Sequence, residues 1–250
     1  MLLFIGRKIK MNIGLIFAGG TGSRMNSKDK PKQFLEVHGK PIIVHTIDLF
    51  EKTKEIDAIV VVILSDYLDY MTELVKKFNL KKVKAIVPGG ETGQLSIFNG
   101  LEAAEKISHH KDDVVLIHDG VRPLINSKVI QDNIECVKEN GSAITTAPAK
   151  ETIVLVNGSQ EVSEVVDRTR SFTAKAPQSF QLADILKVER DAISKGITNA
   201  IDSSTLMGMY NKTLHIVEGP YENIKITTPD DFYMFKALCD AREIGQIYGV

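Results

Sequence analysis

The stretch that decides the fold is Ile13-Gly14-Leu15-Ile16-Phe17-Ala18-Gly19-Gly20-Thr21-Gly22-Ser23-Arg24-Met25. Its first part, Ile13–Phe17, is a short apolar run of the kind that forms a buried strand. Three glycines follow directly, and they let the backbone approach a ligand and point N–H groups at phosphate oxygens. Open α/β sheets bind ligands at the carboxyl ends of their strands, so residues 18–22 are predicted to bind phosphate. The alternative is a glycine-rich turn without a ligand.

The glycine loop differs from two common nucleotide-binding patterns. It lacks the Gly-Lys-Ser/Thr ending of a Walker loop, and no third glycine follows Gly22 at the spacing of a dinucleotide turn. This spacing disfavours an NAD-dependent dehydrogenase. Four cations lie at or just after the loop instead: Arg24, Lys28, Lys30 and Lys32. Cations beside an anion-binding loop neutralise a polyphosphate, which favours a nucleoside triphosphate over a dinucleotide.

Further apolar runs, largely β-branched, predict buried strands at Ala58–Leu64, Val83–Val87, Val114–His118 and Ala143–Ala147. Apolar residues at helical spacing lie between them, in segments 68–78, 97–104 and 130–137, the last with Ser127 as its predicted N-cap. Strand–helix alternation predicts an α/β fold with a Rossmann-like, mostly parallel sheet and helices on both faces. Residues 11–250 are expected to form a single domain.

Residues 150–170 interrupt this alternation. Two extended, polar-alternating pieces, Thr152–Val156 and Glu161–Val166, flank the turn signal Asn157-Gly158 and predict a β-hairpin. A two-stranded ribbon is marginally stable alone and needs a surface to pack against. It is therefore either a surface hairpin or an arm that docks on a second subunit. A helix at Leu182–Ser194, a strand at Leu214–Glu218 and a final helix starting at Thr228-Pro229 are predicted to follow.

Composition excludes several classes of protein. The 250 residues are 43% hydrophobic and 25% charged, which argues against a disordered or fibrous chain. The net charge of −1 gives no general attraction to nucleic acid or to an anionic membrane. Cys136 and Cys239 match no zinc or disulfide spacing, so a reduced, cytoplasmic setting is expected. Residues 1–10 are expected to be an N-terminal extension, too short for a signal peptide or a membrane span.

Five motifs carry a resemblance to a known family. They are Ala18-Gly19-Gly20-x-Gly22-x-Arg24-Met25 with Pro31-Lys32-Gln33, Gly89-Gly90-Glu91 with Ser96, His118–Pro123, and Asn223–Thr227. Together they resemble the cytidylyltransferases that act on 2-C-methyl-D-erythritol 4-phosphate and on ribitol 5-phosphate. The likeness covers nearly all of residues 11–240, with the motifs in the expected order. It implies the nucleotide-diphospho-sugar transferase type of fold.

The resemblance implies a role for each matching residue. The triphosphate of CTP would lie on the loop residues Ala18, Gly19, Gly20 and Gly22, and the cytidine would also contact Gly90, Glu91, Ser96 and Gly120. The implied catalytic residues, which would stabilise charge on the α-phosphate and the departing pyrophosphate, are Arg24, Lys32 and Lys225. The acceptor would be held by Arg122, Thr152 and Arg168. Asp119 would hold Mg²⁺ or orient the acceptor.

The resemblance also implies a homodimer in which the 150–170 arm embraces a second subunit, so that Arg168 completes its neighbour's site. In the implied reaction an acceptor phosphate oxygen attacks the α-phosphorus of CTP in line. The nucleophile is already anionic, so positioning and cationic stabilisation are the main requirements. The expected partners are thus CTP, a polyol phosphate and a second copy of the chain, with neither nucleic acid nor membrane.

Departures from the methylerythritol pattern favour ribitol 5-phosphate as acceptor. That pattern usually has Arg where this chain has Gly93 and Thr where it has Ala176, and its acidic segment is replaced by Ile201–Thr205. The loss of a charged donor and of a hydroxyl group can change which acceptor the site selects. Ser96–Leu101 looks more like the ribitol 5-phosphate enzymes, whose CDP-alditol product would serve surface-polymer synthesis. The alternatives are the methylerythritol enzyme of isoprenoid synthesis, another pentitol phosphate as acceptor, and a CTP-binding regulatory relative without turnover.

Overall fold

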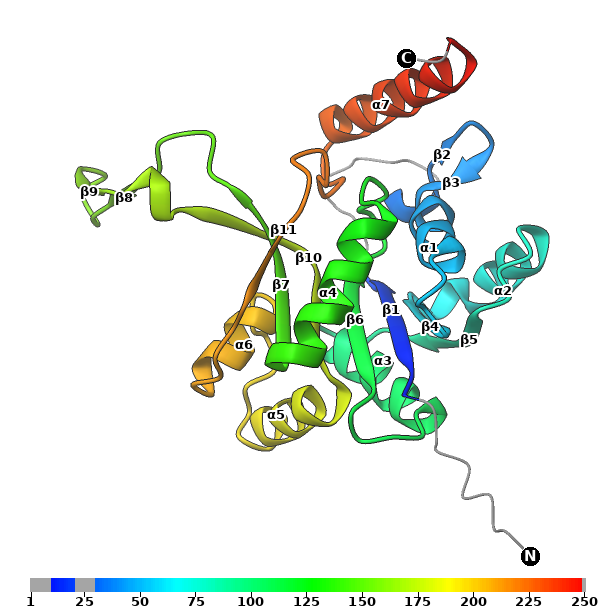
Figure 1. The fold of residues 1–250 in the computed structure, drawn as a ribbon, viewed down its shortest axis with the longest axis horizontal. Coiled ribbons are helices and arrows are strands. Elements are labelled where there is room, and N and C mark those ends of the chain that lie inside the picture. The colour runs from blue at the N-terminus through cyan, green and yellow to red at the C-terminus, as the bar shows by residue number, and fades with distance from the viewer. Residues whose placement is uncertain (1–9, 21–29, 249–250) are drawn as a thin grey trace, which may run out of the picture.

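The protein is described here from a computed structural model, over residues 10–20 and 30–248 (Figure 1). Within these ranges seven strands form the main sheet, in the order β11-β7-β10-β6-β1-β4-β5. Their bounds are β1 Asn12–Ala18, β4 Ala58–Ile63, β5 Val83–Pro88, β6 Val114–Asp119, β7 Ser142–Pro148, β10 Phe172–Gln181 and β11 Ile216–Glu218. Neighbouring strands are parallel except at β10, which runs antiparallel to β6 and β7. The predicted α/β fold with a mostly parallel sheet is confirmed.

Helices cover both faces of the sheet. On one face lie α1 Ile42–Lys52, α2 Leu68–Lys77 and α4 Ser127–Asn140, and on the other lie α3 Gly93–Ile107, α5 Leu182–Ser194 and α6 Ser203–Met209. Alternate residues of one strand serve the two faces: in β4, Ile59 and Val61 join the first apolar cluster, whereas Val60 and Val62 join the second. The strands are therefore buried on both sides, which explains their continuous apolar runs. None of the helices among the described residues is long and apolar enough to cross a membrane.

The last helix, α7 Pro229–Tyr248, belongs to a third, smaller apolar cluster. Phe235 of α7 is buried there with Ile226 and with Val121 and Leu124 from the loop after β6. The backbone N–H of Ile226 also donates to the carbonyl of Val121 (2.9 Å). This cluster fixes residues 224–226 beside the end of β6, where the site lies.

The predicted hairpin forms from β8 Val154–Val156 and β9 Val162–Val165. Figure 1 shows it projecting away from the main sheet. The Asn157 side chain accepts hydrogen bonds from the N–H groups of Ser159 and Glu161, which closes the loop between the strands. A 3₁₀ turn, η4 Arg168–Arg170, follows before β10. The remaining short elements are η2 Lys32–Phe34, β2 Glu36–Val37, β3 Lys40–Pro41 and η3 Ser65–Tyr67.

Two details differ from the sequence predictions. The N-cap of α4 is Asn126 rather than Ser127: its side chain accepts a hydrogen bond from the Val129 N–H (3.0 Å), and Ser127 is already the first helical residue. The strand predicted at Leu214–Glu218 is shorter and begins at Ile216. Helix α5 has the predicted bounds, Leu182–Ser194.

Candidate active site

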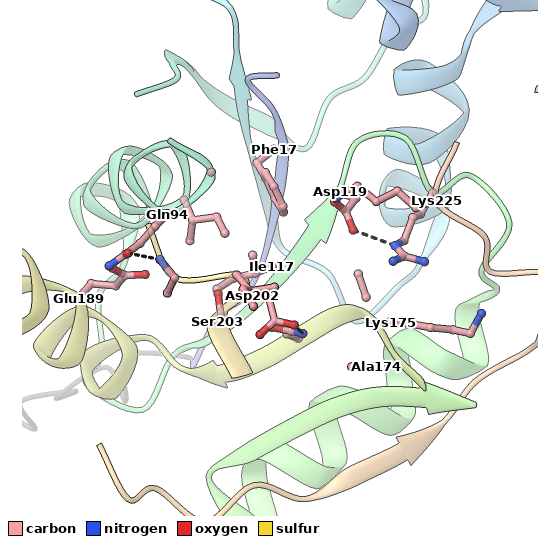
Figure 2. A pocket seen from close by; sticks show the side chains of 17 residues that line it. Phe17, Gln94, Ile117, Asp119, Ala174, Lys175, Glu189, Asp202, Ser203 and Lys225 are labelled. Atoms are coloured by element: carbon pink, nitrogen blue, oxygen red, sulfur yellow. Dashed lines mark hydrogen bonds and ion pairs between the residues drawn. The ribbon is translucent and has the colours of Figure 1, made fainter. Parts of the chain in front are cut away.

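Two pockets open at the carboxyl ends of the strands, as the parallel topology predicts. The loop pocket, of about 360 Å³, is lined by the glycine loop and by the residues that face it, among them Ala18, Gly19, Gly20, Lys32, Gly90 and Ser96. The inner pocket, of about 280 Å³, lies between α3, β10 and the 200–203 segment (Figure 2). Four residues line both pockets: Phe17, Gly93, Asp119 and Lys225. The two pockets thus share one wall.

The described part of the glycine loop is held by two neighbouring segments. The Gln33 side-chain amide, which is buried, donates to the carbonyl of Ala18 (3.0 Å) and more weakly to that of Gly20 (3.4 Å). On the other side, a Cβ at Gly19 would lie 2.8 Å from the Ser96 hydroxyl oxygen, so only glycine permits this approach. Ser96 in turn accepts from the Gly90 N–H (3.0 Å). The predicted loop and the Gly90–Ser96 segment therefore form one surface.

Several predicted nucleotide-binding residues lie on this surface, whereas Gly22 and the predicted catalytic residue Arg24 lie outside the described residues. Ala18, Gly19, Gly20, Gly90 and Ser96 line the loop pocket together with Glu91 and Lys32. Gly120 lines neither pocket; its Cα lies against Ala18, where a Cβ would approach to 2.9 Å, so it sets the spacing of the β1 and β6 ends. Gly22 and Arg24 fall in residues 21–29, which the structure does not describe.

The shared wall carries a compact ion-pair cluster. The Asp119 carboxylate ends β6 and accepts from Arg122 Nε at Oδ2 (2.8 Å) and from Lys225 Nζ at Oδ1 (2.6 Å). Arg122 also donates from Nη1 to the carbonyl of Asn223 (2.9 Å). The side chains of Asp119 and Arg122 are nearly buried, whereas Lys225 is 43% exposed. Asp119 therefore holds Lys225 at the junction of the pockets and Arg122 at the inner pocket.

The charge states in this wall follow from these contacts. Burial by itself would raise the pKa of Asp119, but the charges and hydrogen bonds of Lys225 and Arg122 outweigh it and bring the pKa to about 2. Burial lowers the pKa of the neighbouring His118 to about 4, so this imidazole stays neutral. Its Nε2 lies 3.0 Å from the Arg122 carbonyl. His118 therefore supports the wall and does not add charge to it.

The donor set suits a divalent cation held partly by substrate. No group of three or more His, Cys, Asp and Glu side chains that could hold a metal occurs in the described part of the chain. Mg²⁺ in phosphoryl-transfer sites is typically bound by one or two carboxylates together with substrate phosphates. Asp119 lines both pockets, and a carboxylate offers about four lone-pair positions, of which two are used here. The residues present therefore fit a magnesium ion bound with the nucleotide.

Thr152 and Arg168 lie in the arm and line neither pocket. Both residues are exposed, Thr152 before β8 and Arg168 in η4. The arm also exposes five apolar side chains to between 45% and 63%: Val154, Leu155, Val156, Val162 and Val165. The structure of the single chain therefore keeps these two predicted acceptor residues apart from the cations of the shared wall.

Sequence reasoning assigned roles at the inner pocket to Asp119, Arg122 and Lys225 and noted Gly93, Ala176 and residues 201–205 as departures, but it did not find the other lining residues. Lys175, Ala176 and Gln178 reach it from β10, a strand that the sequence did not predict. The Gln178 side chain accepts from the Ser204 N–H and donates to Asp202, so β10 holds the 201–204 segment in place. This segment had been noted only as a departure from the methylerythritol pattern. Gln33 had been noted only as part of the Pro31-Lys32-Gln33 motif.

The arrangement of the two pockets defines a class of protein. A glycine loop and a second, polar pocket meet at a wall that contains Lys225 and the ionised Asp119, with Arg122 next to it in the inner pocket. Such a wall can hold two anionic substrates together and stabilise charge that develops between them. The site is that of a group-transfer protein acting on phosphorylated substrates.

Comparisons with known proteins identify the family. Residues 13–240 match the family model described as IspD: 2-C-methyl-D-erythritol 4-phosphate cytidylyltransferase. A ribitol-5-phosphate cytidylyltransferase of Streptococcus agalactiae serotype V is 76% identical, over 96% of this chain and 100% of that relative. A 2-C-methyl-D-erythritol 4-phosphate cytidylyltransferase of Clostridium acetobutylicum is 37% identical, over 94% of this chain and 100% of that relative.

A solved structure agrees with these matches. The 4-diphosphocytidyl-2C-methyl-D-erythritol synthase of Anaerococcus prevotii DSM 20548 superimposes with a TM-score of 0.80 at 28% identity, covering 92% of this chain and 96% of that one. The chain belongs to the IspD family of cytidylyltransferases.

Proposed function

We propose that this chain transfers the cytidylyl group of CTP to D-ribitol 5-phosphate and releases pyrophosphate, giving CDP-ribitol. One observation carries the choice of acceptor: 76% identity over the full length of a relative named for ribitol 5-phosphate, against 37% for the methylerythritol phosphate enzyme described above. The geometry agrees with it. Gly93 and Ala176, the two small residues noted in the sequence, both line the inner pocket and leave room for the acceptor.

In this proposal CTP occupies the loop pocket and the acceptor occupies the inner pocket. An oxygen of the acceptor phosphate attacks the α-phosphorus of CTP, the bond from that phosphorus to the bridging oxygen breaks, and pyrophosphate leaves with the bonding electrons. Lys225 projects from the shared wall toward both pockets and stabilises the charge that accumulates on the α-phosphate. Arg122 binds the acceptor phosphate, and Lys32 and Arg24 stabilise the pyrophosphate. Asp119 keeps Lys225 and Arg122 in these positions.

Magnesium belongs to the proposal as the cofactor. Asp119 would hold it, together with phosphate oxygens of the nucleotide. When bound, the ion would neutralise charge on the triphosphate and on the departing pyrophosphate.

The arm supports a homodimer. The arm exposes five apolar side chains, of which Val154 and Val165 pair across the hairpin and share one face, and a second copy of the chain would bury them. Thr152 and Arg168 would then be presented to the neighbour's inner pocket, where the acceptor phosphate binds. We further propose that the enzyme works in the cytoplasm and supplies CDP-ribitol to the synthesis of a cell-surface polymer.

The test is pyrophosphate release from CTP and Mg²⁺, with ribitol 5-phosphate and methylerythritol 4-phosphate offered separately at equal concentration. We expect a clear preference for ribitol 5-phosphate, and no release from the Lys225→Met variant. A preference for methylerythritol 4-phosphate would assign the chain to the other branch of the family. CTP binding without release with either acceptor would favour a regulatory protein or a different acceptor.

A further inference from the structure

The end of the inner pocket that lies away from Asp119 contains a buried carboxyl group that the proposed mechanism does not use. Glu189, on α5, is 1% exposed and lines the pocket. Its carboxyl Oε2 accepts from the Gln94 side-chain amide (2.9 Å). Gln94 is its one hydrogen-bond partner among the described residues, so Oε1 has none there. Oε1 is not one of the fully buried unpaired atoms of the described residues, so it keeps some exposed surface, and the pocket that Glu189 lines could supply its partner.

The position of this carboxyl group is fixed. Gln94 also donates to the carbonyl of Ile197 (3.0 Å) and accepts from the N–H of Ala200 (2.8 Å). Its amide is therefore held from both sides and presents one donor to Glu189. Burial raises the pKa of Glu189 to about 7, although the hydrogen bond from Gln94 lowers it. Near neutral pH the group is thus partly protonated, and a carboxylic acid both donates and accepts, as a hydroxyl group does.

Ser203 gives a second, independent observation. Its side chain is 2% exposed and lines the same pocket, and its hydroxyl is buried without a hydrogen-bond partner among the described residues. The segment that carries it is rigid, because Gln178 binds both Asp202 and the N–H of Ser204. An unpaired buried hydroxyl costs free energy, which a hydroxyl of a bound ligand would recover.

The two groups lie where a polyol chain would extend. Figure 2 shows Glu189 and Gln94 on the opposite side of the pocket from Asp119 and Lys225, with Ser203 between the two ends. An acceptor whose phosphate is held by the cations of the shared wall would therefore direct its hydroxyl groups first toward Ser203 and then toward Glu189. Neither residue is a cation or an apolar group, so the far end is suited to uncharged hydroxyls.

We propose that Ser203 and Glu189 bind hydroxyl groups of the polyol chain and thereby select acceptors long enough to reach them. This inference rests on the proposed function, and it names the residues that set the length of the acceptor. Glu189 contacts the hydroxyl farthest from the phosphate, and Ser203 contacts one nearer to it. A shorter acceptor leaves Glu189 without its partner.

The experiment compares ribitol 5-phosphate with erythritol 4-phosphate, which is shorter by one hydroxylated carbon. Glu189→Leu should lower kcat/KM for ribitol 5-phosphate by about tenfold or more through KM, because a lost polar contact in a buried site discriminates strongly. It should change kcat/KM for erythritol 4-phosphate by less than about twofold. Glu189→Gln keeps a donor and an acceptor and should retain most of the preference. The KM for CTP should be the same in all variants.

Ser203→Ala removes one oxygen atom, and it is the second test of the inference if Glu189→Leu disturbs folding. It should raise KM for ribitol 5-phosphate, with kcat and the KM for CTP unchanged. Equal losses on both acceptors, or no loss in either variant, would overturn the inference while the wild-type preference for ribitol 5-phosphate stands. A wild-type enzyme that does not use ribitol 5-phosphate contradicts the proposed function itself, and the inference with it.

Discussion

Asp119 shows how one side chain can organise a site without reacting. Its two carboxylate oxygens each hold one cation, Arg122 and Lys225, and those cations hold its pKa at about 2. The carboxylate is therefore ionised at every pH at which the protein would be assayed. Because Asp119 lies in the wall common to both pockets, a substitution of this one residue should affect the positioning of both substrates.

We predict that Asp119→Asn lowers kcat by about a hundredfold, the scale expected when preorganised electrostatic groups lose their orientation. The amide cannot balance the two cations, so Lys225 and Arg122 would no longer be held in place. Thermal unfolding and steady-state kinetics check this. Asp132→Asn is a matched control, since it removes an exposed ion pair with Lys128 and should leave kcat unchanged. Wild-type turnover in Asp119→Asn would contradict the role given to Asp119.

Glu189 gives the protein a predictable pH dependence of stability. Its pKa is raised from 4.5 to about 7 in the folded state, so the folded protein binds a proton that the unfolded chain has released. Stability from this group is full below about pH 4.5 and falls as the pH rises to about 7, by up to about 3 kcal/mol. Glu189→Gln is neutral throughout and should remove this fall. Urea unfolding at about pH 5 and about pH 8 measures it. If the free energy of unfolding changes with pH equally in the wild type and in Glu189→Gln, the pKa of Glu189 is not raised in the folded state.

At the scale of elements, the close approach of α3 to the sheet positions the Gly90–Ser96 surface. Gly100 lies where α3 crosses β1 and β4, and a Cβ there would come within 2.7 Å of Val62 Cγ2 and 2.9 Å of Leu15 Cδ1. Thr92 caps the same helix by accepting from the Leu95 N–H (3.1 Å). The helix is thus fixed both along its axis and against the sheet.

We predict that Gly100→Ala destabilises the protein by about 1–3 kcal/mol, because the added methyl group overpacks a filled interface. Alanine favours a helix over glycine by about 1 kcal/mol, so the strain must exceed that gain. Gly93→Ala is the control in the same helix, since its Cβ would meet no atom within 4 Å. It should leave the free energy of unfolding unchanged or slightly higher. Denaturant unfolding of both variants measures the difference in the free energy of unfolding.

The arm yields a prediction about assembly. Replacing Val154 and Val165, which pair across the hairpin and are 45% and 63% exposed, by aspartate would place charge on one face of the proposed interface. We expect the double variant to be a monomer by light scattering, with circular dichroism unchanged, because these side chains contribute little to the core of one chain. Ser159→Asp in the exposed hairpin loop is the control and should leave the mass unchanged. A dimer that survives the double substitution would exclude the arm as the interface.

The apolar strands of the sheet could be predicted from the sequence, whereas β10 could not, and helices α1 and α6 were also left out. Strands β1, β4 and β6 are buried on both faces, so their composition alone identifies them. Strand β10 begins with exposed residues and contains Pro177, which normally argues against a central strand. The proline lies in the gap between Ala174 and Gln178 where the pairing of β10 with β7 is irregular. A local pattern cannot show such an irregularity.

The site residues that could be found from the sequence are those that stand in motifs. Asp119, Lys225 and the glycine loop stand in recognisable motifs, and the structure brings their described members together. Glu189, Gln94 and Ser203 come from three helices, and only the folded chain brings them to one pocket. Their contacts span about a hundred residues of sequence, as between Gln94 and Glu189, and no spacing rule connects them.

At the scale of the whole molecule, the three apolar clusters stabilise different parts of the fold. The two large clusters stabilise the sheet and its helices, whereas the small third cluster ties α7 and residues 224–226 to the loop after β6. Lys225 stands beside Ile226, which is fully buried in that cluster. The reacting end of the site is therefore anchored from both the middle and the C-terminal part of the chain. The arm is the part that reaches outward, with Arg168 at its base.

If the arm completes the site of a second subunit, two different inactive variants should restore activity when they are mixed. In the proposed dimer each centre takes Lys225 from one copy and Arg168 from the other. Lys225→Met and Arg168→Ala proteins, each inactive alone, would then complement one another on mixing. Half of the dimers would be hybrids with one intact centre, so roughly a quarter of the wild-type rate should return. Mixtures that stay inactive after subunit exchange would mean that Arg168 serves its own chain.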